Sequence, residues 1–145
     1  MTTTALTKPS KSFLIIAILA LLWNLMGVMN FYLDVTISSE ALSALPDGQR
    51  ELYETTPLWT KILFGIATIS GTLACILLLM KKSLAIPVFI ISFIAVIIQM
   101  TYWLVFTNSM KVYGPAGAVM PLIVIFISAF LVWYANSSKA KGWIS

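Results

Sequence analysis

Four long apolar runs occupy most of this chain, and none of them contains an aspartate or a glutamate. They lie at about 13–33, 58–80, 84–106 and 118–134. A run of about 18 or more apolar residues is long enough to cross a bilayer as a helix. The 145 residues are 60% hydrophobic and only 10% charged, whereas a soluble domain has about 25% charged residues. We therefore expect an all-α integral membrane protein, whose four-helix bundle forms a single domain over residues 1–145.

The basic residues divide unevenly between the two ends of these spans. Three pairs of lysines share one end: Lys8, Lys11, Lys81, Lys82, Lys139 and Lys141. The other end carries Arg50, Lys61 and Lys111. Cytoplasmic segments of membrane proteins are enriched in lysine and arginine. We therefore expect a multi-pass protein of the bacterial inner membrane with both termini in the cytoplasm.

The segment between the first two spans, 34–56, contains all the acidic residues: Asp34, Glu40, Asp47, Glu51 and Glu54. Within it, Ser39 precedes one group of apolar residues and Pro46 precedes another, as at the start of short helices. We expect two short amphipathic helices in this outer loop, lying along the outer membrane surface. The second outer segment, 107–117, carries a glycine- and proline-containing stretch that indicates a turn.

Most kinds of catalytic chemistry lack their residues here. The chain has no histidine and a single cysteine, Cys75, and no carboxylate lies within a span. A metal or haem site would lack its usual ligands, and a nucleophile would lack a base. Lys61 lies one turn from the outer end of its span, so we expect it to extend outward towards Glu54 or Asp34. We therefore predict a protein that is not an enzyme and has no catalytic residues, metal or cofactor.

A net charge of +4 could indicate a nucleic-acid partner. The basic residues are instead spread over loops, without a basic stripe interleaved with aromatic residues. We therefore expect no nucleic-acid partner.

Uncharged polar residues inside the spans are the candidate site. At about 1.5 Å per helical residue, one group lies about 10–16 Å from the inner face: Asn24, Ser70, Thr72, Ser92 and Ser128. Asn30 and Gln99 form a second layer about 23–25 Å from that face. These residues could line a polar cavity for an uncharged solute, or they could make hydrogen bonds between helices. We favour hydrogen bonding, because serine and threonine can also bond their own helix backbone.

The second span carries a stripe of small residues at four-residue spacing, Ala67, Gly71 and Cys75. Such a stripe lets another helix approach closely. Gly27 on the first span is a candidate for the matching notch. We expect this seam to join helices within one chain rather than two protomers.

Several segments together resemble a family of small four-span bacterial membrane proteins: residues 23–28, Leu45-Pro46, Tyr53, residues 57–59, residues 113–115, Met120-Pro121 and residues 142–144. Members of that family often carry the label "sugar transporter". The resemblance implies a four-span membrane protein and supplies no catalytic or binding residues. Small multidrug exporters have a similar size, but their transport depends on a glutamate in the first span, where this chain has Asn24.

Two functions follow from these features. The first is a structural or accessory component of the membrane, in contact with lipids and with a second copy or another membrane protein. The alternative is a transporter or facilitator of a small neutral, sugar-like solute, acting as a dimer, with Trp23, Tyr102 and Trp103 available to stack on a sugar ring. An enzyme acting on lipid ranks last, because no pair of a nucleophile and a base is visible. The carboxylate pair Asp47 and Glu51 is better explained as the solvated face of a loop.

Overall fold

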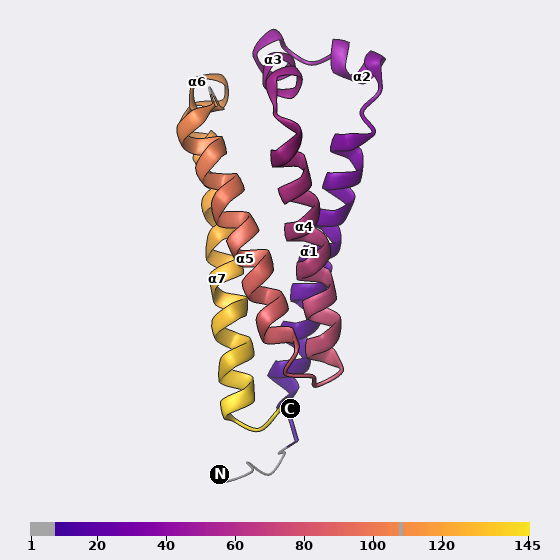
Figure 1. Cartoon of the computed structure of the whole chain (residues 1–145), viewed down its shortest axis with the longest axis vertical. Helices are drawn as coiled ribbons and strands as arrows, with labels where there is room; N and C mark the ends of the chain where they lie inside the picture. Colours follow the sequence, from indigo (N-terminus) through magenta and orange to yellow (C-terminus); the bar gives the residue numbers. More distant parts are fainter. Residues whose placement is uncertain (1–7, 108) are drawn as a thin grey trace.

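The computed structural model describes residues 8–107 and 109–145, and every regular element in these ranges is helical. The four long helices are α1 (Lys11–Val35), α4 (Leu58–Leu79), α5 (Ala85–Thr101) and α7 (Val119–Ala140). They run side by side along the long axis of the molecule (Figure 1). Helices α1 and α4 are each long and apolar enough to cross a membrane, and so are α5 and α7 when the helical turns next to them are included. This confirms the all-α class and the four apolar spans.

The remaining elements are short. They are α2 (Ser39–Ser43), α3 (Asp47–Thr55), the π-helix η1 (Tyr102–Phe106), α6 (Ser109–Tyr113) and the 3-10 helix η2 (Gly114–Ala118). Two helices in the segment 34–56 agree with the prediction from the sequence. In place of the turn expected over 113–117, the structure has the end of α6 followed by η2, and Pro115 lies in the first turn of that 3-10 helix. Helix α7 also extends six residues beyond the predicted span, to Ala140.

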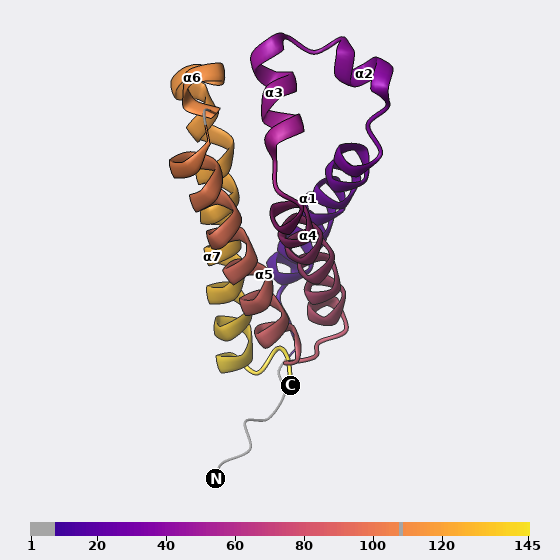
Figure 2. The same cartoon turned by 45° about the horizontal axis from the view of Figure 1, so that its top comes forward.

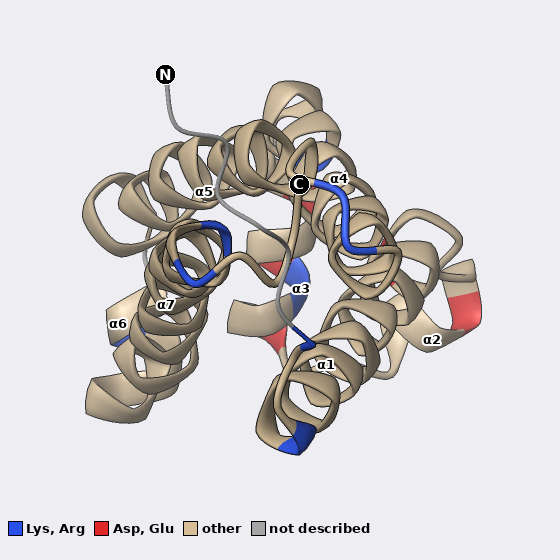
Figure 3. Ribbon diagram, turned by 90° about the horizontal axis from the view of Figure 1, so that it is seen from below, with Lys and Arg blue, Asp and Glu red and all other residues tan. Residues whose placement is uncertain are grey.

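The helices pack in the order α1, α4, α5, α7. Helix α4 lies between α1 and α5, and α5 in turn packs against α7, whereas α1 and α7 make no comparable contact. Seen from one end, the four helices follow an arc (Figure 3). Figure 2 shows that the pair α1 and α4 diverges from the pair α5 and α7 towards the end that carries α3 and α6. The bundle is therefore tighter at one end than at the other.

The two ends of the bundle differ in charge. The start of α1, the turn between α4 and α5, and the end of α7 all lie at the same end of the bundle, which we call the basic end (Figure 1). The lysines of that end stand out in Figure 3, where it faces the viewer. The opposite end, which carries α2, α3 and α6, includes all five acidic residues and we call it the acidic end.

Residues after α7 join three parts of the basic end. The Ser83 amide donates to the Ser145 carbonyl at 2.9 Å, and the Ser145 amide donates to the Lys81 carbonyl at 3.0 Å. The Ile144 side chain is only 2% exposed, and the Trp143 ring meets Phe13 of α1 edge to face, with 5.7 Å between centroids. This segment therefore ties the start of α1, the α4–α5 turn and the end of α7 together.

Helices α4 and α7 both end in a Schellman arrangement, in which a residue with positive φ lets two amides bond back into the last turn. After α4 these amides belong to Lys81 and Lys82, each with an N···O distance of 2.9 Å. After α7 they belong to Gly142 and Trp143, at 3.0 and 2.9 Å. The residue with positive φ is Gly142 in one case, at 76°, but Lys81 in the other, at 61°. Lys81 therefore carries a steric cost that glycine would avoid.

The Lys81→Gly variant should raise the free energy of unfolding by about 0.5–1 kcal/mol, because glycine adopts positive φ without the clash of a Cβ atom. Gly142→Ala should lower it by a similar amount. Thermal or SDS-induced unfolding in detergent micelles, followed by circular dichroism, measures both effects. Lys82→Gly is the matched control and should not stabilise the protein. Equal effects of Lys81→Gly and Lys82→Gly would contradict this explanation.

Candidate functional site

Asn24 of α1 reaches across to α4 near the middle of the bundle. Its Nδ2 donates to the Ala20 carbonyl at 2.9 Å and to the Cys75 Sγ at 3.4 Å. The first bond stays within α1, whereas the second joins α1 to α4. Cys75 is fully buried and therefore acts as a small packing residue at this interface.

Gly71 provides the space that Asn24 occupies. A Cβ atom at Gly71 would lie 2.1 Å from Asn24 Oδ1 and 3.2 Å from Ser92 Oγ. Ser92 is buried on α5, and its hydroxyl donates to the Ala67 carbonyl of α4 at 2.6 Å. Polar groups from three helices thus meet around one glycine.

The other polar residues predicted in the layers do not join this cluster. The hydroxyls of Ser70, Thr72 and Ser128 each donate to a backbone carbonyl four residues earlier on the same helix. The Asn30 side chain is exposed and that of Gln99 is half-buried, and neither makes a hydrogen bond to another described residue. Of the seven residues singled out in the sequence, the structure therefore brings only Asn24 and Ser92 together.

The small-residue stripe forms an interface inside the chain. Ala67, Gly71 and Cys75 are all buried. On α1, a Cβ atom at Gly27 would lie 2.9 Å from the Thr68 methyl, so this glycine also faces α4. Gly65, which lies next to the stripe on α4, also faces α1, because a Cβ atom there would lie 2.8 Å from the Phe31 ring. The seam between α1 and α4 is therefore longer than the stripe itself.

The Gly71→Ala variant should lower the free energy of unfolding by about 1–3 kcal/mol, because its methyl group would overlap the Asn24 amide. Adding Asn24→Ala removes the overlapping amide, so the double variant should be more stable than Gly71→Ala alone. Ser70→Ala is the control on the neighbouring residue and should have little effect. Unfolding in detergent micelles measures all three variants. A Gly71→Ala protein as stable as Ser70→Ala would contradict the close approach.

A second polar group lies at the acidic end. The Asp34 carboxylate interacts electrostatically with the Lys61 ammonium and is hydrogen-bonded to the Tyr53 hydroxyl. Lys61 thus extends towards one of the two carboxylates expected from the sequence. Tyr53 was not anticipated here, because no local pattern indicates which residue of α3 faces the end of α1.

The environment of Tyr53 raises the pKa of its hydroxyl above the usual value of 10.0. Burial is the largest cause, followed by the negative charge of Asp34. Both effects disfavour the tyrosinate in the folded protein. Tyr53 therefore contributes stability that is fully present below pH 10.0 and is lost as the pH rises through its higher folded-state pKa.

A spectroscopic titration tests this assignment. The difference in tyrosinate absorbance between the native protein and the Tyr53→Phe variant, followed from about pH 9 to about pH 12, should show an apparent pKa above 10.0. The Asp34→Asn substitution should lower the apparent pKa of Tyr53, because it removes the neighbouring negative charge. An apparent pKa at or below 10.0 would show that Tyr53 is solvated as in a free peptide.

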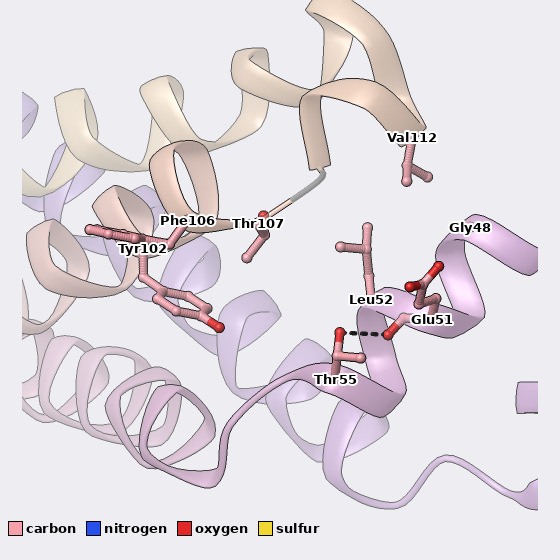
Figure 4. Close-up of a pocket in the computed structure, with 8 residues that line it drawn as sticks. All are labelled: Gly48, Glu51, Leu52, Thr55, Tyr102, Phe106, Thr107 and Val112. Atoms are coloured by element: carbon pink, nitrogen blue, oxygen red, sulfur yellow. Dashed lines mark hydrogen bonds between the residues drawn. The ribbon is translucent and has the colours of Figure 1, made fainter.

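The acidic end also contains a cavity of about 200 Å³, which we call the α3 cavity (Figure 4). It lies between α3 and the segment that leads from α5 to α6. Its lining residues are Gly48, Glu51, Leu52, Thr55, Tyr102, Phe106, Thr107 and Val112. The Thr55 hydroxyl donates to the backbone carbonyl of Glu51 at 2.7 Å. This bond does not involve the side-chain carboxylate of Glu51.

A second, more open space of about 520 Å³ lies on α5, and we call it the α5 pocket. It is almost entirely apolar and is lined by Trp59, Ile97, Ile98, Thr101, Tyr102 and Phe106. Tyr102 and Phe106 line both spaces, so the α3 cavity and the α5 pocket adjoin. Neither space is lined by the polar residues predicted within the spans.

The π-helix η1 positions the aromatic rings between the two spaces. Tyr102 and Phe106 stack with 6.1 Å between centroids, and Trp59 meets Tyr102 edge to face at 4.9 Å. The Trp103 carbonyl at this wider turn accepts hydrogen bonds from the hydroxyls of Thr107 and Ser109. Such π-helical turns are frequent at functional sites. The sequence pattern alone does not distinguish this turn from the helix before it.

Comparison of the chain with protein-family models, with curated proteins and with solved structures found no match. Among the described residues, no three Cys, Asp or Glu side chains lie close enough together to hold a metal ion.

Proposed function

We propose that this chain is a structural or accessory component of the bacterial inner membrane rather than an enzyme. The proposal rests on the hydrogen bonds that the polar groups in the middle of the bundle make to neighbouring helices. Asn24 and Ser92 bond to neighbouring helices around Gly71, where close packing leaves no room for a solute. These groups therefore hold helices together, which is the usual role of uncharged polar residues inside a membrane bundle.

The charge distribution supports an orientation with both termini in the cytoplasm. The basic end carries six lysines, whereas the acidic end carries three basic residues along with all the carboxylates. Lysine-rich ends of membrane proteins remain on the cytoplasmic side. On this orientation α2, α3 and α6 lie on the outer side of the membrane.

The hydroxyl groups within the spans support a role without catalysis. Those of Ser70, Thr72, Ser92 and Ser128 donate to backbone carbonyls instead of facing a basic side chain. A serine nucleophile requires a base within hydrogen-bond distance to take its proton. The contacts of these residues therefore serve packing.

The outward faces of the helices favour partners within the membrane. Large apolar side chains are exposed along every span, among them Leu19 of α1, Ile69 of α4, Ile94 of α5 and Phe126 of α7. Lipid covers such surfaces, and a second copy or another membrane protein would bind there as well. Helices α1 and α7 have the most free surface, because each has only one neighbouring long helix.

One observation favours the alternative, facilitated passage of a small neutral solute by a dimer. The side-chain amides of Asn30 and Gln99 lack hydrogen bonds to other described residues and lie nearer the acidic end, where the two helix pairs diverge (Figure 2). Amides with free donors and acceptors could bind hydroxyl groups of a sugar-like solute. In this alternative the solute would bind Gln99 and Asn30 rather than the cluster around Gly71.

Native mass spectrometry of the protein released gently from its own membrane separates the two functions. We expect a defined complex with another membrane protein or a stable dimer without solute. A dimer that keeps a small polar adduct would favour transport instead. A strict monomer that retains no partner would contradict the accessory role.

An uptake assay gives the second test. If the chain conducts a neutral solute, Gln99→Leu combined with Asn30→Leu should abolish uptake without loss of expression. Asn136→Leu is the matched control, because this exposed amide bonds the backbone of its own helix. Uptake that survives the double variant would exclude the polar layers as the route.

A further inference from the structure

The α3 cavity carries a negative charge. Among the residues that the structure describes, Glu51 is the only charged one in its lining, and the other polar side chains there are the hydroxyls of Thr55, Tyr102 and Thr107. In Figure 4 the Glu51 side chain lies beside Leu52 and Gly48 at one side of the cavity, with Tyr102 and Phe106 at the other. A carboxylate is a group that pairs with an ammonium ion through charge-assisted hydrogen bonds.

The α5 pocket has the opposite character. Apart from the Thr101 side chain and the Tyr102 hydroxyl, its lining is hydrocarbon and aromatic carbon, from Ile97, Ile98, Trp59 and Phe106. It adjoins the α3 cavity through Tyr102 and Phe106, which line both. A polar space next to an apolar space matches a molecule with a charged head and a hydrocarbon tail.

The position of the two spaces along the bundle agrees with this match. Trp59 starts α4 and Tyr102 follows α5, so both rings lie where the apolar spans meet the acidic end. Tryptophan and tyrosine rings favour the headgroup level of a bilayer. The α3 cavity then lies at the level of lipid headgroups, and the α5 pocket faces the acyl chains along α5.

We infer that the acidic end binds a phospholipid with an ammonium headgroup, of which phosphatidylethanolamine is the simplest. The ammonium group lies in the α3 cavity on the side of the Glu51 carboxylate, and the Tyr102 and Phe106 rings border the passage from this cavity to the α5 pocket. One acyl chain follows the α5 pocket past Ile98 and Ile97. Two adjoining spaces of opposite character, joined by the same two aromatic residues, carry this inference independently of any transport or accessory role.

Other ligands fit the lining less well. A phospholipid whose headgroup is only anionic would place its charge against Glu51 and would have no ammonium group to pair with that carboxylate. A small soluble cation would use the α3 cavity alone and would make no contact with the apolar α5 pocket. The lipid with both an ammonium group and acyl chains satisfies both spaces.

The test uses the full chain in detergent micelles, titrated with lipid and read by native mass spectrometry. Phosphatidylethanolamine should bind more tightly than phosphatidylglycerol with the same acyl chains. Phosphoethanolamine, which has the headgroup alone, should bind far more weakly than the lipid. Equal binding of the two lipids would overturn the ammonium site, and equal binding of phosphoethanolamine would overturn the role of the acyl chain.

Variants assign the site to its residues. Glu51→Gln should weaken binding of phosphatidylethanolamine about tenfold, because it removes the only carboxylate of the lining. Glu54→Gln on the same helix is the matched control and should leave binding unchanged, because Glu54 lies outside the lining. Circular dichroism confirms that both variants fold. Equal binding by the two variants would refute the assignment of Glu51.

A second pair tests the aromatic residues. Phe106→Ala should weaken binding several-fold, whereas Phe126→Ala on α7 should not. Both side chains are 73% exposed, so neither substitution removes a core contact. Equal loss in both variants would show that any exposed aromatic residue serves, and would overturn the inference.

Discussion

Helices α1 and α4 approach so closely at Gly71 that nothing larger than a hydrogen fits between that residue and the Asn24 amide. In lipid the hydrophobic effect gives little drive for helices to associate, so close packing and hydrogen bonds must supply it. On the other side of α4, the Ser92 hydroxyl binds the Ala67 carbonyl and holds α5 in place. Helix α4 thereby becomes the central helix, with α1 on one side and α5 on the other.

The unequal ends of the bundle follow from this arrangement. Helices α1 and α7 do not pack along their lengths, so the residues around Ile144 close the basic end by joining α1, the α4–α5 turn and α7. At the acidic end the connection runs through α3 and α6. There α3 buries Leu52 and places Gly48 against Val112 of α6, which bridges the diverging helix pairs. The α3 cavity lies at this end, and the α5 pocket adjoins it.

Depth along each span was predictable from the sequence, but rotation about each helix axis was not. Asn24 and Ser92 were placed at similar depths by counting residues, and the structure brings both to Gly71. Ser70 is the neighbour of Gly71 and lies at the same depth, yet its hydroxyl bonds its own helix. One residue corresponds to about 100° of rotation, so packing against other helices decides which neighbour faces inward.

The sequence by itself determined the class of protein, the four spans, the two short helices of the segment 34–56 and the difference in charge between the ends. These depend on length, composition and local signals, which a single stretch of chain contains. Only the tertiary structure decided that Glu51 shares a cavity with Tyr102 and Phe106, and that Tyr53 meets Asp34. Such meetings join residues of different helices, so they depend on the packing of the whole bundle and on the π-helical turn at the end of α5.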